Sequence, residues 1–461
     1  MMEEELNQHI KCSNKIEELI ISLFAYISDK NGKVIVDRYY SETQKHNIII
    51  KAAQEFISKI MAMLPLDSFK ELTDHIINLL LDCPLAERDI FCFAILLEID
   101  KNIPFLVEEK PYLFSGESFS YIEYLFIMNI AEPFFAKSLN EMGIRRGRQT
   151  SAFQRDGINS HFSCFKVYKE NYFTDYHPIV KYLLKKSMKS RHYLYNFGNE
   201  LKIGMSPFSR NRWFHVIENE CNHTFSISTD DVNNDHKRRI EEILQIADQQ
   251  KYDIIMFPEL AIDGKTSNSL KQLVLENEFS NLKLIFFGSC WNDNENVAAL
   301  YNSQGSLLLE EKKKSRFSYY DKKRDIVFSE NIKEESDIHF VDIPGLGRIV
   351  YLICADMLEE GITSTYNKLE SNFVFVSALS NNTDLLVKRA KFNADDQGIT
   401  TMICNACTEL SEGDGNFAAY ACTLSLSHKK IECCPICLEQ TCATEEKCGL
   451  CIKSAYVTKK L

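Results

Sequence analysis

From residue 213 onward, short apolar runs alternate with helical stretches, and this rhythm limits the fold more than any other feature of the chain. The runs are four to eight residues long and rich in Ile, Val and Phe, which is typical of strands buried in a parallel sheet. Helical patterns between them, such as residues 236–249, favour an α/β domain. The clearest runs lie within residues 214–219, 253–260, 282–291, 306–317, 348–357, 372–380 and 400–407.

The first 143 residues show a different pattern. Ile16, Leu19, Ile20 and Leu23 recur at helical spacing, and several later segments repeat that spacing. The pattern predicts an α-helical N-terminal domain over residues 1–143, with helices over 46–64, 68–81, 86–100 and 118–142.

Residues 144–212 are strongly basic, although the whole chain has a formal charge of −12. Aromatic side chains are interleaved with the basic ones. Cations neutralise phosphates and aromatic faces stack on bases, so this connecting region is a candidate for binding nucleic acid. The alternatives are a protein partner or an acidic part of the same chain, or a local aromatic core with a solvated basic face. The candidate contact residues are Arg145, Arg146, Arg148, Lys185, Lys186, Lys189 and Arg191.

Three side chains with chemical potential follow three of the apolar runs. Glu259 follows the run at 253–257, a lysine triplet ends the run at 306–311, and Cys354 follows the run at 349–353. Each has an ordinary explanation alone: an ion-paired acid, a solvated edge strand, and a small core thiol. Because α/β sheets place their chemistry at the carboxyl ends of strands, we expect an acid, a cation and a thiol to meet there.

The motifs around these side chains resemble the carbon–nitrogen hydrolase (nitrilase/amidase) superfamily over residues 213 to about 410. The family's FPE signature is similar to Phe257-Pro258-Glu259, and its nucleophile motif is similar to Cys354-Ala355-Asp356. The family's asparagine, Gly turn and strand ending in lysine resemble residues 301–313, ending at Lys313.

The resemblance implies an αββα sandwich fold and a set of roles. Glu259 is the implied general base, Cys354 the nucleophile that forms a thioester, and Lys313 the cation that stabilises the oxyanion together with the backbone N–H of Ala355. No cofactor is implied for catalysis. A small amide is favoured over a nitrile, because the tryptophan and glutamate that often follow cysteine in true nitrilases are absent. The family commonly assembles, so a homo-oligomer is expected.

Two assignments stay open in the sequence. Lys312 and Lys314 are alternatives to Lys313, because a slip of one residue on a strand reverses the face on which a side chain lies. Many family members carry a second glutamate that positions the lysine, and both Asp325 and Glu330 are candidates for it by spacing.

The C-terminal segment 431–461 is rich in cysteine. Six of the chain's 16 cysteines lie between Cys433 and Cys451. Two CxxC pairs suit a tetrahedral structural zinc whose binding would fold a short tail, with an iron–sulfur cluster as the minor alternative. The predicted ligands are Cys434, Cys437, Cys448 and Cys451, with Cys433 and Cys442 as possible substitutes.

Four regions are therefore predicted: an α-helical domain (1–143), a basic connecting region (144–212), a nitrilase-like domain (213–430) and a zinc-binding tail (431–461). No apolar run reaches the ~20 residues that a membrane span needs, and no secretory signal is recognisable, so a cytoplasmic protein without membrane contact is expected. The leading hypothesis is hydrolysis of a non-peptide C–N bond. The alternative is a nitrilase-like scaffold that binds nucleic acid or a protein.

Overall fold

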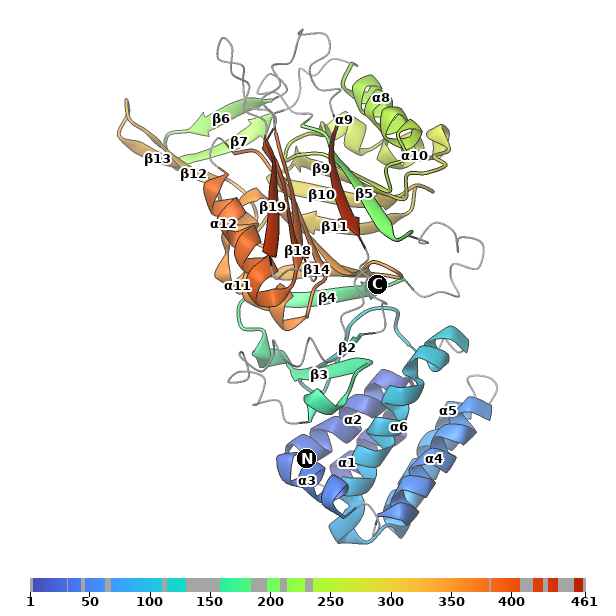
Figure 1. Ribbon diagram of the computed structural model, residues 1–461. Helices are drawn as coiled ribbons and strands as arrows, with labels where there is room; N and C mark the ends of the chain where they lie inside the picture. The colour runs from blue at the N-terminus through green and yellow to red at the C-terminus, as the bar shows by residue number, and fades with distance from the viewer. Residues whose placement is uncertain are drawn as a thin grey trace. The chain divides into compact units, whose positions relative to one another are not determined.

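The computed structural model (Figure 1) divides into two compact units, each considered by itself. The first unit comprises residues 1–131, 137–173 and 180–190, and the second comprises residues 132–136, 174–179 and 191–461. The structure describes residues 3–30, 32–42, 46–62, 68–109, 114–129, 158–183, 197–207, 214–228, 235–380, 383–406, 418–425, 430–437 and 452–458.

The first unit begins with helices, as predicted. The α2 and α6 helices are apolar on most sides and supply much of its core. Figure 1 shows the helices lying beside one another in a bundle. They are α1 (Glu3–Cys12), α2 (Ile16–Ser28), α3 (Gly32–Ser41), α4 (Asn47–Ala62), α5 (Ser68–Asp82) and α6 (Arg88–Glu109).

The helix predicted over residues 118–142 is wrong for the part that the structure describes. Residues there form β1 (Phe119–Tyr121) and β2 (Tyr124–Met128), which join β3 (Phe165–Lys169) in an antiparallel sheet of order β1-β2-β3. Every residue of β2 is buried. Aromatic and β-branched side chains favour a strand in this position, and the apolar spacing alone was too dense to separate strand from buried helix.

The second unit is built on two large sheets. One has the order β11-β10-β9-β8-β5-β20, with β5, β8 and β9 parallel to one another, and the other has the order β19-β18-β17-β16-β15-β14-β4, with β15, β16 and β17 parallel. The strands of the six-stranded sheet are β5 (Glu200–Met205), β8 (Ile254–Met256), β9 (Leu284–Asn292), β10 (Glu295–Asn302), β11 (Leu307–Lys312) and β20 (Lys453–Thr458). Those of the seven-stranded sheet are β4 (His177–Tyr182), β14 (Asp337–Ile343), β15 (Gly347–Ile353), β16 (Phe373–Ala378), β17 (Thr400–Asn405), β18 (Ala418–Ser425) and β19 (Lys430–Cys437).

The two sheets pack face to face. The ring of Phe286 in β9 stacks on that of Phe375 in β16 with 4.2 Å between centroids, and it meets Tyr351 in β15 edge-on at 4.9 Å. The inner face of each sheet is therefore buried. Every residue of β15, β16 and β17 is buried, so these strands are covered on both faces, which explains their continuous apolar runs.

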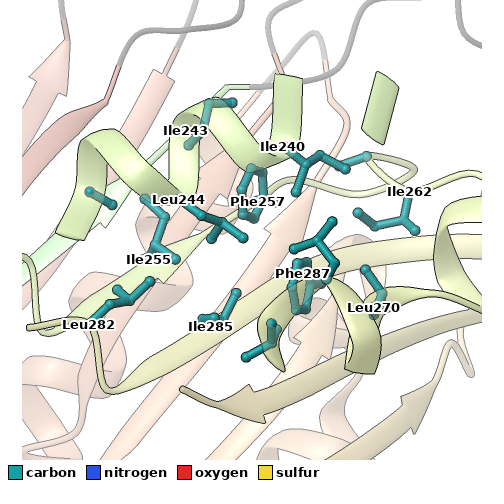
Figure 2. Close-up of a cluster of buried hydrophobic side chains, with 14 of the residues drawn as sticks. Ile240, Ile243, Leu244, Ile255, Phe257, Ile262, Leu270, Leu282, Ile285 and Phe287 are labelled. Atoms are coloured by element: carbon teal, nitrogen blue, oxygen red, sulfur yellow. The ribbon is translucent and has the colours of Figure 1, made fainter. Parts of the chain in front are cut away.

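Helices cover the outer faces. The α8 helix (Asp235–Gln249) and α10 (Leu270–Asn277) place apolar side chains on the six-stranded sheet, where Ile243 and Leu244 pack with Ile255 and Phe287 (Figure 2). The α11 helix (Glu360–Lys368) and α12 (Asp384–Phe392) lie along the seven-stranded sheet in Figure 1. The mixed α/β unit therefore has the αββα layer order that the resemblance implied.

A smaller four-stranded sheet, of order β12-β13-β7-β6, completes the second unit. Its inner face meets the sandwich through a cluster that includes Phe225, Leu260, Trp291 and Phe328. The strands are β6 (His215–Asn219), β7 (Thr224–Ser228), β12 (Ser318–Asp321) and β13 (Ile326–Glu330).

The domain boundaries differ from the predicted ones. The β5 strand lies before residue 213 and β20 lies within the predicted tail, yet both belong to the six-stranded sheet of this unit. β5 pairs with β8, and β20 pairs with β5 at the edge of the sheet. The β19 strand also begins at Lys430 and extends the other large sheet. The predicted boundaries lie where the charge or the cysteine content of the chain changes. Strand pairing, which sets the observed boundaries, does not depend on either property.

None of the helices that the structure describes combines the length and the apolar character that crossing a bilayer requires.

Candidate active site

A chain of buried hydrogen bonds from strands β9, β15 and β16 holds the turn that carries Glu259. The Gly288 N–H donates to the Tyr351 hydroxyl (2.9 Å), which contacts Ser377 Oγ (2.7 Å), and Ser377 Oγ donates to the Phe257 carbonyl (2.6 Å). Gly288 has a φ of +76°, and a Cβ there would lie 2.1 Å from the Pro258 carbonyl oxygen. Glycine is therefore required for the β9 strand to approach the turn this closely.

Glu259 projects from this turn into a buried site and is only 4% exposed. Its Oε1 accepts hydrogen bonds from Lys313 Nζ (2.8 Å) and Asn296 Nδ2 (3.0 Å), and its Oε2 accepts one from the backbone N–H of Leu379 (3.1 Å). A carboxylate with donors on both oxygens is fixed in orientation.

Lys313 follows β11 directly and lies between two carboxylates. Its Nζ is 2.8 Å from Glu259 Oε1 and 2.7 Å from Glu330 Oε2, and its side chain is 1% exposed. Burial acts to lower the pKa of Lys313, but the charges of Glu259 and Glu330 outweigh it and raise the pKa above its ordinary value. The ammonium form is therefore the stable one in this site.

Glu330, the last residue of β13, is the acid that the structure places against Lys313. Its Oε2 also accepts the backbone N–H of Phe317 (2.7 Å). Burial and the nearby charge of Glu259 raise the pKa of Glu330, while Lys313 opposes them. Asp325, the other candidate, is not brought to Lys313: it lies in the exposed turn between β12 and β13, where Tyr320 donates a hydrogen bond to it.

Cys354 comes directly after β15 and begins a short 3₁₀ turn, Cys354–Leu358, which also contains Ala355. Its φ of +49° is uncommon for a residue with a side chain, and such strain often occurs at functional sites. Burial and the adjacent Glu259 raise the pKa of the Cys354 thiol, and Lys313 and the backbone of Leu379 act in the opposite direction. The thiol is therefore protonated at neutral pH, with a carboxylate beside it.

Asp356 connects the Cys354 turn to the end of β11. Its Oδ1 accepts the backbone N–H groups of Lys314 (3.0 Å) and Ser315 (2.6 Å). The side chain is fully buried. These two hydrogen bonds fix the chain after Lys313 against the chain after Cys354, so they help to set the position of both side chains.

The other two lysines of the triplet point elsewhere. Lys312 is 36% exposed and pairs with Glu295 at 3.2 Å, while Lys314 is buried against Glu311. Of the three lysines, all within the described range 235–380, Lys313 is the one that contacts Glu259.

Asn296 and the backbone of Leu379 are site groups that sequence reasoning missed. Leu379 contributes an N–H, which the sequence does not mark in any way. Asn296 lies at the start of β10, far from the recognised motifs, and nothing in the local pattern separates it from an ordinary polar residue near a turn.

The predicted zinc ligands cannot be placed as a site. Cys434 and Cys437 lie in β19, for which the structure describes the backbone, and Cys448 and Cys451 lie outside the described residues. Among the described side chains no group of three or more His, Cys, Asp or Glu residues is arranged to hold a metal ion. Structural zinc stays a prediction.

The predicted nucleic-acid contacts also lie outside the described residues, from Arg145 to Arg148 and from Lys185 to Arg191. Several aromatic side chains of the same region are described, and they are core residues: Phe162 and Phe165 are buried and stack with 4.6 Å between centroids. This favours a local core for these rings, while a nucleic-acid or protein partner for the basic residues stays a prediction.

Comparison with known proteins gives structural similarity alone. No protein-family model matches the sequence, and no curated protein sequence matches it. Similar solved structures include Nit3 of Saccharomyces cerevisiae, a nitrilase superfamily member, with 12% identity over 57% of this chain and 91% of that chain (TM-score 0.38).

Two further structures are similar at the same level. An amidase of the nitrilase superfamily from Nesterenkonia AN1 has 14% identity over 57% of this chain and 92% of that chain (TM-score 0.35). The C. elegans NitFhit protein has 13% identity over 49% of this chain and 58% of that chain (TM-score 0.36). Of these three proteins, Nit3 and the Nesterenkonia amidase are described as nitrilase superfamily members. Similarity this distant does not assign an activity, so the assignment depends on the geometry around Glu259.

Proposed function

We propose that this chain is a cysteine-dependent carbon–nitrogen hydrolase that acts on a small amide. The observation that carries the proposal is the buried Lys313 ammonium, held within 2.8 Å of both Glu259 and Glu330. Cys354 lies beside Glu259 on a turn of unusual backbone geometry. A buried acid, cation and thiol in one site provide a base, an oxyanion partner and a nucleophile.

Attack begins with a neutral thiol, because burial raises the pKa of Cys354. Glu259 takes the thiol proton as Sγ bonds to the amide carbon, and the carbonyl π electrons move to oxygen. Lys313 and the Ala355 N–H stabilise that oxyanion; one such donor typically contributes ~10²–10³-fold to the rate.

The tetrahedral intermediate then collapses to a thioester. The carbon–nitrogen bond breaks, and Glu259 returns its proton to the nitrogen, which leaves as ammonia or an amine. Water next attacks the thioester as Glu259 removes a proton from it. The carbon–sulfur bond breaks, the sulfur regains a proton, and the carboxylic acid leaves.

An amide is preferred to a nitrile for a reason that the sequence supplies. Ala355 and Asp356 follow Cys354, and the tryptophan and glutamate that accompany the cysteine in true nitrilases are absent. The predicted homo-oligomer, zinc and macromolecular partner are not needed for this chemistry and stay predictions.

The first test measures thiol reactivity. Iodoacetamide labelling of each cysteine is followed by mass spectrometry across pH in wild type, Glu259→Gln, Lys313→Ala and the control Lys312→Ala. Cys404 is an internal reference, since it is buried outside the site with its Sγ 3.3 Å from the Ser206 carbonyl oxygen. We expect Cys354 to react far faster than Cys404, and Glu259→Gln to slow it by about 10²-fold or more.

The expected pattern depends on the charged partners as well as on burial. Lys312→Ala leaves the Cys354 rate unchanged, because Lys312 lies outside the site, while Lys313→Ala lowers it. If Cys354 reacts as slowly as Cys404 in every variant, the hydrolase proposal is wrong and the scaffold alternative replaces it.

A further inference from the structure

Asn296 connects two parts of the site. It lies in β10, is 1% exposed, and its backbone carbonyl accepts the Lys313 N–H at 2.8 Å. Its side-chain Nδ2 donates to Glu259 Oε1 at 3.0 Å. The residue is therefore held by its backbone against Lys313 and by its side chain against Glu259.

The contact with Glu259 fixes which way the amide of Asn296 faces. An ionised carboxylate only accepts hydrogen bonds, so the NH₂ group must face Glu259 and the carbonyl oxygen must face away from it. Oδ1 is fully buried and has no hydrogen-bond partner among the residues that the structure describes. A buried acceptor without a partner is destabilising, so this atom is suited to receive a donor from a bound molecule.

The distance from Oδ1 to Glu259 suits the nitrogen of a bound amide. Oδ1 and Nδ2 share one carbon, so Oδ1 lies no more than roughly 5 Å from Glu259 Oε1. A nitrogen that receives its proton from Glu259 must lie about 3 Å from that carboxylate. A nitrogen about 3 Å from Glu259 Oε1 can therefore also lie at hydrogen-bond distance from Oδ1, because two atoms roughly 5 Å apart can both lie about 3 Å from a third.

We propose that Asn296 Oδ1 accepts an N–H of the scissile amide and makes this site selective for amides that carry at least one N–H. The inference depends on the proposed function, because it assigns the substrate class of the same site. Asn296 is then a specificity-determining residue: it binds the nitrogen that Glu259 protonates. Esters and N,N-disubstituted amides lack that donor and leave Oδ1 buried without a partner.

The test compares substrates that share an acyl group and differ at the leaving group. The panel contains primary amides from acetamide to hexanamide, benzamide and L-glutamine, with the methyl ester and the N,N-dimethyl amide of each acid. The measured quantity is kcat/KM, which reports the acylation step for amide and ester alike. Wild type is compared with Asn296→Ala, Asn296→Asp and the control Asn393→Ala, a buried asparagine bonded to Tyr366 and Thr401.

Loss of the acceptor has a different signature from misplacement of Glu259. Glu259 removes the Cys354 proton and protonates the leaving nitrogen of every amide, so a positioning defect lowers kcat/KM equally for the primary amide and for the N,N-dimethyl amide of the same acid. We expect Asn296→Ala to lower the ratio of kcat/KM for the primary amide to kcat/KM for the N,N-dimethyl amide by about 10–100-fold. Asn296→Asp keeps an acceptor oxygen and so keeps the ratio, although both rates fall, and Asn393→Ala leaves the ratio unchanged.

Three results would contradict the inference, and only the third also contradicts the proposed function. If Asn296→Ala lowers both rates but leaves the ratio unchanged, Asn296 does not bind the substrate nitrogen, and the proposed hydrolase function still holds. If Asn296→Asp lowers the ratio as much as Asn296→Ala does, the inference is also contradicted, because the acceptor oxygen that Asp retains then has no effect. A wild type that hydrolyses no member of the panel removes the proposed function and this inference with it.

Discussion

Lys313 and Lys314 are consecutive residues, both almost fully buried and both paired with glutamate, yet their surroundings differ. Lys313 lies between Glu259 and Glu330, close to Cys354. Lys314 contacts Glu311 and donates to the Lys312 carbonyl at 2.8 Å. Adjacent residues of an extended chain point to opposite sides, so one lysine faces the candidate site and the other faces away from it.

The comparison shows that burial alone does not set the charge of a lysine. Burial acts to lower the pKa of both. For Lys313 the charges of two carboxylates outweigh burial, and for Lys314 burial dominates and lowers the pKa to about 8, against the charges of Asp356 and Glu335. The site lysine is thus kept as an ammonium, while its neighbour titrates much closer to neutral pH.

The largest expected effect is on catalysis by Lys313. Lys313→Ala removes the cation that stabilises the oxyanion, and we expect kcat/KM for the best amide of the panel to fall by about 10³-fold. Lys312→Ala, at the exposed position, leaves kcat/KM within about twofold, since surface charges contribute little. Equal loss in the two variants would mean that the triplet acts through its summed charge and not through the geometry of Lys313.

The next effect is on stability, and it belongs to Lys314. Lys314→Ala leaves Glu311 buried without this cation, and we expect the free energy of unfolding to fall by about 3–5 kcal/mol. Replacing both partners, as in Glu311→Leu with Lys314→Met, removes two buried charges together and restores most of that loss. Urea unfolding followed by circular dichroism measures both variants; a double variant as unstable as the single one would contradict this account.

A smaller effect separates the two acids proposed to position Lys313. Glu330→Gln keeps the shape but removes one of the two charges beside Lys313, and we expect kcat/KM to fall by up to ~10²-fold through misplacement of the ammonium. Asp325→Asn, in the exposed turn, is the matched control and leaves kcat/KM unchanged. Loss of activity in Asp325→Asn would show that the β12–β13 hairpin acts on the site by a route other than Glu330.

The smallest effect is a pH dependence of stability. Because the folded chain holds the pKa of Lys314 at about 8, below the ordinary value for lysine, the unfolded chain binds more protons between pH 8 and pH 10. The contribution of Lys314 to stability therefore rises with pH in this window. Unfolding of wild type and of the Glu311→Leu, Lys314→Met variant at pH 7.5, 8.5 and 9.5 isolates this slope, because Lys313 is common to both. A difference that does not change with pH would contradict it.

Much of the candidate site could be predicted because its motifs are local. Glu259 and Cys354 each follow a continuous apolar run. The family resemblance favours Lys313 after the turn at Gly305, with Lys312 and Lys314 as alternatives that the sequence alone leaves open. Glu330 could not be separated from Asp325, since the choice depends on how the β12–β13 hairpin folds back. Asn296 could not be found at all, because its role comes from β10 pairing beside β11.

In the fold too, elements that depend on local sequence pattern could be predicted, and elements that depend on distant strand pairing could not. Helix α8 and strands β9, β15 and β16 follow from local periodicity and agree with the expected ranges. Strands β5 and β20 were missed because their pairing joins distant parts of the chain, and short strands with mixed polarity carry little local signal. The sequence pattern predicts a helix where β1 and β2 form, because apolar residues there are too dense to show a period.

The pairing of β5 with β20 has a consequence for how the chain is made. Glu200 lies opposite Thr458 in that pair, and β5 also pairs with β8, at the centre of the six-stranded sheet. During synthesis the chain emerges from its amino end, so every segment that carries a site residue leaves the ribosome before β20 does. Until β20 has emerged, β5 lacks its neighbour on that side, and an open strand edge can pair with another chain and promote aggregation.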